Sequence, residues 1–203
     1  AMTVRVKICG VTCAEDATAA LAAGADMIGI NFYAPSPRSI DLERALAIRA
    51  AIGRGAILVG VFVNADRAYI EQRRRALGLD LLQFHGDEAD AALAGWPVPV
   101  IRALRVPAGA AAAALARVRA DFILLDTFHP ALYGGTGLAR PLTELRGLDL
   151  SRVIISGGLN PGNARLAAAL GPFALDCASG VESAPGAKDH SKLRSFIINA
   201  RNS

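Results

Sequence analysis

Ile57-Leu58-Val59-Gly60-Val61-Phe62-Val63 carries no polar side chain. Because an extended chain points alternate side chains to opposite faces, a strand within residues 56–63 would be apolar on both faces. Strands of this kind belong to parallel sheets that are covered by helices. The segment therefore predicts an α/β fold.

Similar apolar runs recur along the chain, at residues 5–9, 27–32, 81–85, 98–104, 122–126, 152–156 and 173–177. Helix-like segments with apolar residues at three- and four-residue spacings lie between runs, at 14–23, 42–52, 68–77 and 164–170. Eight strand-and-helix units of about 25 residues fit the chain length. We expect a single (β/α)8 TIM barrel domain over residues 2–203. The alternative, an open doubly wound sheet, favours a GxGxxG turn after its first strand, which residues 9–13 lack.

The composition narrows the class of protein and partner. The 203 residues include 22 basic and 18 acidic side chains, a net charge of +4, and 53% are hydrophobic, which excludes a disordered or collagen-like chain. The basic run Arg73-Arg74-Arg75 is short and has no interleaved aromatic residues, so we expect no nucleic-acid partner. Neither a membrane-spanning stretch nor a signal peptide is evident, so we expect a cytoplasmic protein with no membrane partner. The small charge surplus favours an anionic small molecule, and we expect a phosphorylated one, bound by a monomer or homodimer.

The cysteines and histidines indicate no metal site. Cys9, Cys13 and Cys177 are odd in number and fit neither a disulfide framework nor a paired zinc motif, so we expect reduced thiols. His129 and His190 have no partner at metal-ligand spacing. We therefore predict no metal site.

Polar residues at the carboxyl ends of the strands are the candidates for chemistry, because TIM barrels place their sites there. They are Lys7, Cys9, Asn31, Asn64, Gln83, His85, Arg102, Asp126, Ser156, Asp176 and Ser179.

Two glycine-containing loops follow the last two strands. Gly157 and Gly158 lie in the first loop, and Ser179 and Gly180 lie in the second. Glycine lets backbone N–H groups approach an anion closely, so the two loops together favour a phosphate clamp over ordinary turns. A third cluster, Gly134-Gly135-Thr136-Gly137, suits either a mobile cover or a tight turn.

Nine short segments, in order, carry a family resemblance that spans nearly the whole chain. They are residues 7–10 (KICG), 36–38 (SPR), 59–64 (VGVFVN), 82–86 (LQFHG), 125–127 (LDT), 134–137 (GGTG), 156–159 (SGGL), 179–182 (SGVE) and 185–189 (PGAKD). The sequence resembles the phosphoribosylanthranilate isomerases of tryptophan biosynthesis. It departs from the usual strings at Phe84, where leucine is commoner, and at Ala178, where a second serine is frequent; the second change puts phosphate affinity in doubt.

The resemblance implies an Amadori rearrangement by general acid–base catalysis. N-(5-phosphoribosyl)anthranilate would become 1-(2-carboxyphenylamino)-1-deoxyribulose 5-phosphate in a cofactor-independent aldose–ketose isomerisation, an intramolecular oxidoreduction. The family's base carries over to Cys9 and its acid to Asp126. Arg38 carries over as the group that binds the anthranilate carboxylate. Further pocket-lining residues would be Lys7, Asn31, Gln83, His85 and Gly135.

Each assignment has a structural alternative. Cys9 could be a small buried apolar residue, Asp126 a helix cap, and Arg38 part of a surface ion pair. Lys7 lies two residues before Cys9 on the same strand face, where its charge could lower the thiol pKa; it could instead pair with Asp126.

Two other functions stay open. One is the barrel isomerase of histidine biosynthesis, but that family's design has a carboxylate at the end of the first strand, where this chain has Cys9. The other is a phospholigand-binding barrel without turnover.

Overall fold

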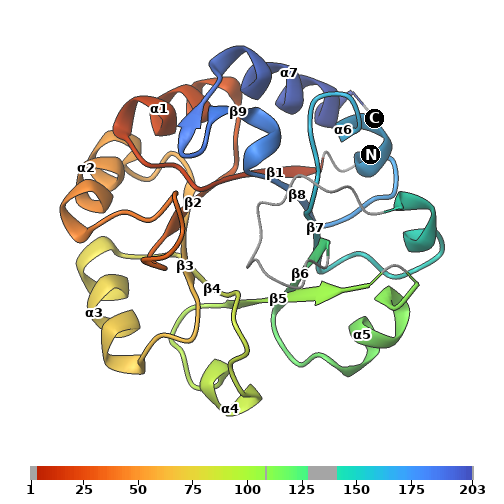
Figure 1. Cartoon of the computed structure of the whole chain (residues 1–203), viewed down its shortest axis with the longest axis horizontal. Coiled ribbons are helices and arrows are strands. Elements are labelled where there is room, and N and C mark those ends of the chain that lie inside the picture. The colour runs from red at the N-terminus through yellow and green to blue at the C-terminus, as the bar shows by residue number, and fades with distance from the viewer. Residues whose placement is uncertain (1–3, 108, 128–140, 203) are drawn as a thin grey trace.

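Eight parallel strands close into a barrel in the computed structural model, which describes residues 4–107, 109–127 and 141–202 (Figure 1). The strands are β1 (Arg5–Cys9), β2 (Met27–Asn31), β3 (Ile57–Phe62), β4 (Leu81–Phe84), β5 (Val100–Val106), β6 (Phe122–Thr127), β7 (Val153–Ile155) and β8 (Ala174–Cys177). Each pairs with the next in the chain, and β8 pairs with β1. The predicted barrel is confirmed, and the predicted strand over 56–63 lies in its wall.

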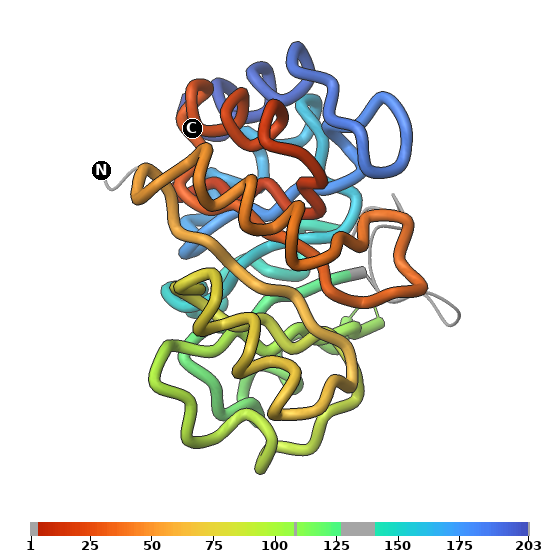
Figure 2. The backbone as a smooth tube through the Cα atoms, turned by 90° about the vertical axis from the view of Figure 1, so that its left-hand side faces the viewer, coloured from red at the N-terminus to blue at the C-terminus, as the bar shows by residue number. Residues whose placement is uncertain are grey.

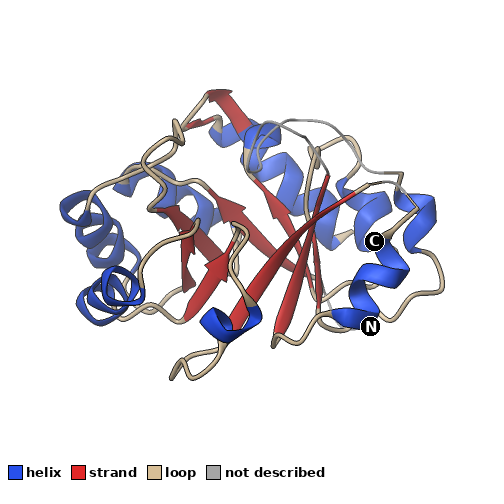
Figure 3. Ribbon diagram, turned by 60° about the horizontal axis from the view of Figure 1, so that its bottom comes forward, coloured by secondary structure: helices blue, strands red, loops and turns tan. Residues whose placement is uncertain are grey.

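Helices surround the barrel (Figure 3). They are α1 (Ala14–Ala23), α2 (Leu42–Ile52), α3 (Arg67–Leu77), α4 (Asp90–Leu93), α5 (Ala111–Arg117), α6 (Ala164–Ala168) and α7 (His190–Arg201), with 3-10 turns η1 (Leu142–Leu145) and η2 (Ser179–Val181). A short hairpin of β9 (Glu182–Ala184) and β10 (Ala187–Lys188) follows β8. Within the described residues, no helix has the length and apolar character needed to cross a bilayer.

Two apolar clusters explain why the strands are apolar on both faces. The smaller cluster consists of alternate strand residues: Met27, Val59, Leu81, Ile101, Ala103, Leu124, Ile154 and Ala174. The larger one joins the opposite strand faces, such as Leu58 and Leu82, to buried helix residues such as Ile48 and Ile70. A strand between these two clusters has no face in contact with solvent, which suits residues 57–62 because they carry no polar side chain.

The regular alternation of strands and longer helices that the sequence predicts is not kept after β4, and the unit after β6 lies partly outside the described residues. After β4 the helix α4 has four residues, and after β6 the described residues contain only the 3-10 turn η1 before β7. The strand predicted at 98–104 is β5 at Val100–Val106 instead. Pro99 accepts a ladder hydrogen bond from Leu82 but has no N–H to donate, so regular pairing begins after it.

Helix caps and chain turns fix the loops at the carboxyl end of the barrel. Asp41 accepts a hydrogen bond from the Arg44 N–H at the start of α2, and Asp189 caps α7 in the same way. Figure 2 shows the loop after β2, in orange, and the β9–β10 hairpin, in blue, on the same side of the molecule. Side chains from the two ends of the chain can therefore meet there.

Candidate active site

A cavity of about 260 Å³ opens at the carboxyl ends of the strands. Its lining includes six of the predicted site residues: Cys9, Asn31, Arg38, Gln83, His85 and Asp126. Cys9 comes from β1 and Asp126 from β6, so a thiol and a carboxylate from separate strands face one space. The predicted residue Gly135 lies outside the described residues.

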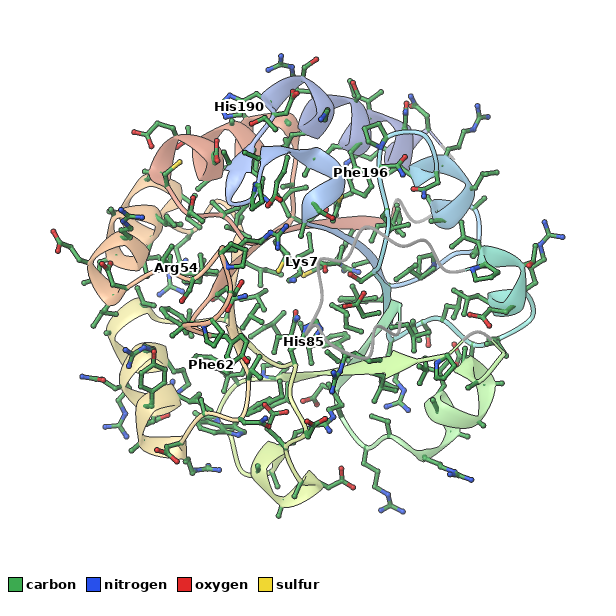
Figure 4. The ribbon with its side chains drawn as sticks, in the orientation of Figure 1. Lys7, Arg54, Phe62, His85, His190 and Phe196 are labelled. Carbon is green, nitrogen blue, oxygen red and sulfur yellow. The ribbon has the colours of Figure 1, made fainter. Side chains whose placement is uncertain are left out.

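Lys7 lies beneath this cavity with no exposed surface (Figure 4). Its Nζ is 2.7 Å from Oδ1 of Asp176, the residue beside it in the β1–β8 ladder. The other oxygen of Asp176 accepts a 2.9 Å hydrogen bond from the Ser156 hydroxyl. The alternative pairing of Lys7 with Asp126 is therefore wrong: barrel closure puts β8, not β6, next to β1.

Lys7 also lies close to the Cys9 thiol. A Cβ atom at Gly29 of β2 would come within 2.9 Å of Cys9 Sγ and 3.1 Å of Lys7 Nζ, so glycine leaves the room that both groups need. Burial raises the pKa of Cys9, and the Lys7 charge lowers it only in part, so the net shift is upward. Burial alone would lower the pKa of Lys7, but the charges of Asp176 and Cys9 raise it above its ordinary value. Lys7 thus stays an ammonium ion.

Arg38 is held by a carboxylate from the other end of the chain. Its Nε and Nη2 donate to the two oxygens of Glu182 over 2.8 and 2.7 Å. The hydrogen bond to Glu182 raises the Arg38 pKa above its ordinary value. Burial opposes ionisation of Glu182, but Arg38 and Lys188 more than offset it and lower the pKa of that carboxyl. The guanidinium therefore keeps its charge at the cavity wall.

Lys188 ties this ion pair to the ends of β1 and β8. Its Nζ donates to Glu182 Oε1 over 2.9 Å, to the Cys9 carbonyl over 2.7 Å and to the Ala178 carbonyl over 3.1 Å. Gly10 leaves room for the Arg38 stem, because a Cβ there would lie 2.5 Å from Arg38 Cδ. The network fixes Arg38 relative to Cys9.

Asp126 faces His85 across the cavity. Its Oδ2 is 3.3 Å from His85 Nε2, and the amide nitrogen of Gln83 is 3.0 Å from His85 Nδ1. Asp126 is 3% exposed, so it contacts little solvent. Asn31 organises the loop that carries Arg38. It accepts a hydrogen bond from the Tyr33 N–H and contacts the Ser36 hydroxyl, and both partners lie in that loop.

A smaller pocket adjoins the main cavity and shares Asp126, Ser156, Asp176 and Ala178 with it. The predicted phosphate residues Gly157, Gly158 and Ser179 line it. Both glycines have positive φ, 80° and 70°, a conformation that glycine adopts without strain.

Gly180 is not among the lining residues of this smaller pocket. A Cβ on Gly180 would lie against the Leu159 carbonyl oxygen. Its glycine therefore permits the close packing of η2 against the loop after β7.

The comparisons with known proteins agree with this geometry. Residues 6–199 match the family model described as N-(5'-phosphoribosyl)anthranilate (PRA) isomerase. The chain belongs to this isomerase family.

Relatives in the family cover almost the whole chain. The N-(5'-phosphoribosyl)anthranilate isomerase of Pseudomonas fluorescens Pf-5 is 48% identical over 98% of this chain and 97% of its own length. The crystal structure of the Thermotoga maritima isomerase is 36% identical, with a TM-score of 0.89 over 98% of this chain and 100% of that one. A phosphoribosylanthranilate isomerase in complex with reduced 1-(o-carboxyphenylamino)-1-deoxyribulose 5-phosphate has a TM-score of 0.82 at 36% identity, over 98% and 100% of the two chains.

Sequence reasoning named Asp176 and Ser156 as candidates without a specific role, and both line the cavity. It did not single out Glu182 or Lys188, which hold Arg38 and the ends of β1 and β8. Asp176 and Ser156 were noted as strand-end residues, and Glu182 and Lys188 lie in the SGVE and PGAKD segments. The sequence did offer a signal for these four residues, because each is a polar residue inside or beside one of the segments that carry the family resemblance. Their partners depend on barrel closure, which brings residues 7 and 176, or 38 and 182, together.

Cys13 and His190 line neither pocket, Cys177 lines the smaller one, and His129 lies outside the described residues. Cys13 precedes α1, and Cys177 donates to the Leu159 carbonyl. His190 contacts Asp16 over 2.8 Å. Among the described residues, no three His, Cys, Asp or Glu side chains are arranged to hold a metal ion.

Proposed function

We propose that this chain converts N-(5'-phosphoribosyl)anthranilate to 1-(o-carboxyphenylamino)-1-deoxyribulose 5-phosphate by general acid–base catalysis without a cofactor. Family membership supports the isomerase activity. The observation that carries the chemistry is the thiol of Cys9 and the carboxyl of Asp126 in one cavity, beside a glycine-lined pocket. Such an enzyme is an aldose–ketose isomerase, an intramolecular oxidoreductase.

Asp126 is the proposed acid. It protonates the ring oxygen of the ribose, the ring C–O bond breaks, and the anthranilate nitrogen forms an iminium with C1. Cys9, as the thiolate, then removes the proton from C2 to give an enolamine, which becomes the ketone. The nearby Lys7 ammonium stabilises the thiolate against the burial that raises its pKa. General acid and base groups of this kind each contribute about 10²- to 10⁴-fold in rate.

Arg38 is the proposed partner of the anthranilate carboxylate. A guanidinium has five N–H donors, and Glu182 occupies one on Nε and one on Nη2. The end formed by Nη1 and Nη2 still offers two parallel donors, which suits a bidentate carboxylate. The phosphate would lie at Gly157, Gly158 and Ser179, where backbone N–H groups can approach it closely. Ala178 offers no hydroxyl, so backbone donors carry more of this contact.

We further propose that residues 2–203 form one catalytic domain that acts in the cytoplasm, as a monomer or homodimer, without nucleic acid or a membrane. A single cavity that draws on the first, sixth and eighth strands supports the one-domain view, since no part of the barrel holds the whole site.

The deciding experiment incubates the purified chain with phosphoribosylanthranilate in metal-free buffer and follows the loss of substrate fluorescence. We expect conversion by the wild type and a loss of about 10²-fold or more in kcat for Cys9→Ala. The matched control is Cys13→Ala, which removes a thiol outside the cavity lining and should retain the wild-type rate. A folded wild-type protein without turnover would support the binding-barrel alternative and refute the proposal.

A further inference from the structure

A row of three side chains crosses the cavity from β4 to β6. Gln83 and His85 come from β4 and the loop directly after it, and Asp126 comes from β6. The amide nitrogen of Gln83 faces Nδ1 of the ring at 3.0 Å, and Nε2 faces Asp126 Oδ2 at 3.3 Å. Figure 4 shows His85 near the centre of the barrel. Each ring nitrogen therefore faces a polar side chain within one buried row.

Two atoms of this row have unused hydrogen-bonding capacity. Within the described part of the chain, Gln83 Oε1 and His85 Nε2 are buried without a hydrogen-bond partner. Gln83 is 1% exposed, so little of the side chain is open to solvent. Buried polar atoms are normally paired, and an unpaired one calls for an explanation.

The chemistry of the two side chains supplies an explanation. An amide nitrogen only donates, so in the observed orientation Nδ1 accepts and a neutral ring carries its proton on Nε2, toward Asp126. A half-turn of the Gln83 amide exchanges its nitrogen and oxygen. Oε1 then accepts from a protonated Nδ1. The row can thus accommodate a neutral or a charged ring.

We propose that His85 returns to Asp126 the proton that this residue donates in each turnover, and that the Gln83 amide turns so that Oε1 accepts from Nδ1 when Nδ1 is protonated. The proposal rests on the proposed acid role of Asp126. A carboxyl group in water is largely ionised at neutral pH, whereas imidazole exchanges protons there. An imidazole in contact with Oδ2 is therefore a suitable proton source.

The proton balance closes within the isomerisation. Asp126 gives a proton to the sugar ring oxygen, and the Nε2–H of the charged ring passes its proton to the Asp126 carboxylate. The neutral ring that remains is protonated on Nδ1, and its Nε2 regains one proton from solvent. As the enolamine becomes the ketone, C1 takes up one proton and the C2 hydroxyl loses one. The Cys9 thiol releases the C2 proton to solvent. No net proton is consumed.

The other charged or titratable groups at this cavity come from the opposite wall. Among the described residues they are Cys9 of β1, Tyr33 and Arg38 after β2, and Asp176 of β8. Arg38 is engaged by Glu182, and Asp176 by Lys7 and Ser156. Among the described residues, Asp126 is the carboxylate within ion-pair distance of the His85 ring.

The test compares two replacements of His85 in the full chain. His85→Gln keeps an N–H donor that can reach Asp126 but exchanges no proton, and His85→Ala removes both functions. We expect kcat to fall about tenfold or more in both, with KM within about twofold, because the change affects proton transfer rather than binding. Imidazole added to His85→Ala should restore part of kcat. His190→Gln, at a histidine outside the cavity lining, is the control and should be unaffected by imidazole.

The outcomes distinguish a failure of the proton-return role of His85 from a failure of the proposed isomerase function. Full kcat in His85→Gln would show that His85 only holds Asp126 in place, and would overturn the proton-return role. A folded His85→Ala that imidazole does not rescue would overturn it too. If His85→Ala does not fold, the His85→Gln rate alone decides. An inactive wild type would instead refute the proposed function.

Discussion

The two walls of the cavity differ in how completely their polar groups are paired. The paired wall consists of the lining residues Arg38 and Asp176 together with their ion-pair network of Lys7, Glu182 and Lys188, where cations meet carboxylates at 2.7 to 2.9 Å. The relay wall consists of Gln83, His85 and Asp126, where the ring meets the carboxylate at 3.3 Å and, within the described residues, two buried polar atoms have no hydrogen-bond partner. Fixed charges suit the binding of a rigid anion, whereas unused bonding capacity suits a proton that moves. The comparison teaches that the proposed acid and its proton source lie on one wall, whereas the proposed base Cys9 and the carboxylate-binding Arg38 lie among paired charges on the other.

The largest effect is expected on the relay wall. Asp126→Asn removes the proposed acid while keeping the size of the side chain, so kcat should fall by about 10²- to 10⁴-fold. Asp90→Asn, at an exposed position at the start of α4, is the matched control and should keep the wild-type kcat. Steady-state kinetics on both variants make the measurement. If Asp126→Asn and Asp90→Asn had similar kcat values, Asp126 would not be the acid, and the proposed difference between the two walls would be wrong.

On the paired wall the largest change should appear in stability. Lys7→Met leaves the Asp176 carboxylate buried without its cation, and breaking a buried ion pair from one side costs about 3–5 kcal/mol of unfolding free energy. Urea denaturation measures this loss. Arg75→Met breaks a pair with Glu71 at the surface, so its denaturation midpoint should stay near the wild-type value. An unchanged midpoint in Lys7→Met would show that the buried pair is not a structural requirement.

A smaller effect is expected when the ion pair between Glu182 and Arg38 is weakened. Glu182→Gln keeps the shape of the side chain but weakens the charge-assisted bonds to Arg38, so KM should rise about tenfold with kcat within about threefold. Glu43→Gln, exposed in the first turn of α2, is the control. A fall in kcat at unchanged KM would mean that the paired wall takes part in the chemistry.

The smallest expected effect is the pH dependence of the contribution that Glu182 makes to the unfolding free energy. Because the pKa of Glu182 is lowered in the folded protein, its stabilisation is present above the ordinary glutamate pKa and is lost as the pH falls through the lowered value. The difference in unfolding free energy between wild type and Glu182→Gln should therefore narrow as the pH falls from neutral into the acid range. A constant difference would contradict a charged Glu182.

Much of the fold could be predicted because a strand that is buried on both faces is a nearly continuous apolar run in the sequence. Residues 57–62 and 5–9 form strands inside the predicted limits, and α1 and α2 have the predicted bounds. The short α4 and the 3-10 turn η1 could not be predicted from regular spacing. Their lengths depend on which neighbours cover the barrel, and Pro99 shifts the start of β5 by removing a donor.

The site was predictable where a side chain faces the cavity from its own strand. Cys9, Gln83 and Asp126 could be placed from strand ends alone, and family motifs added Arg38. The partners of these residues could not be predicted, because they come from positions far along the chain. Lys7 and Asp176 are 169 residues apart, and their contact exists only once β8 closes on β1.

The central claim is that one substrate bridges the two walls. A crystal structure of this chain with reduced 1-(o-carboxyphenylamino)-1-deoxyribulose 5-phosphate tests it most directly. The account predicts the carboxylate on Nη1 and Nη2 of Arg38, the phosphate at Gly157, Gly158 and Ser179, and the sugar carbons between Cys9 Sγ and the Asp126 carboxyl. A ligand whose sugar contacts only one of these two groups, or whose phosphate lies outside the smaller pocket, would contradict it.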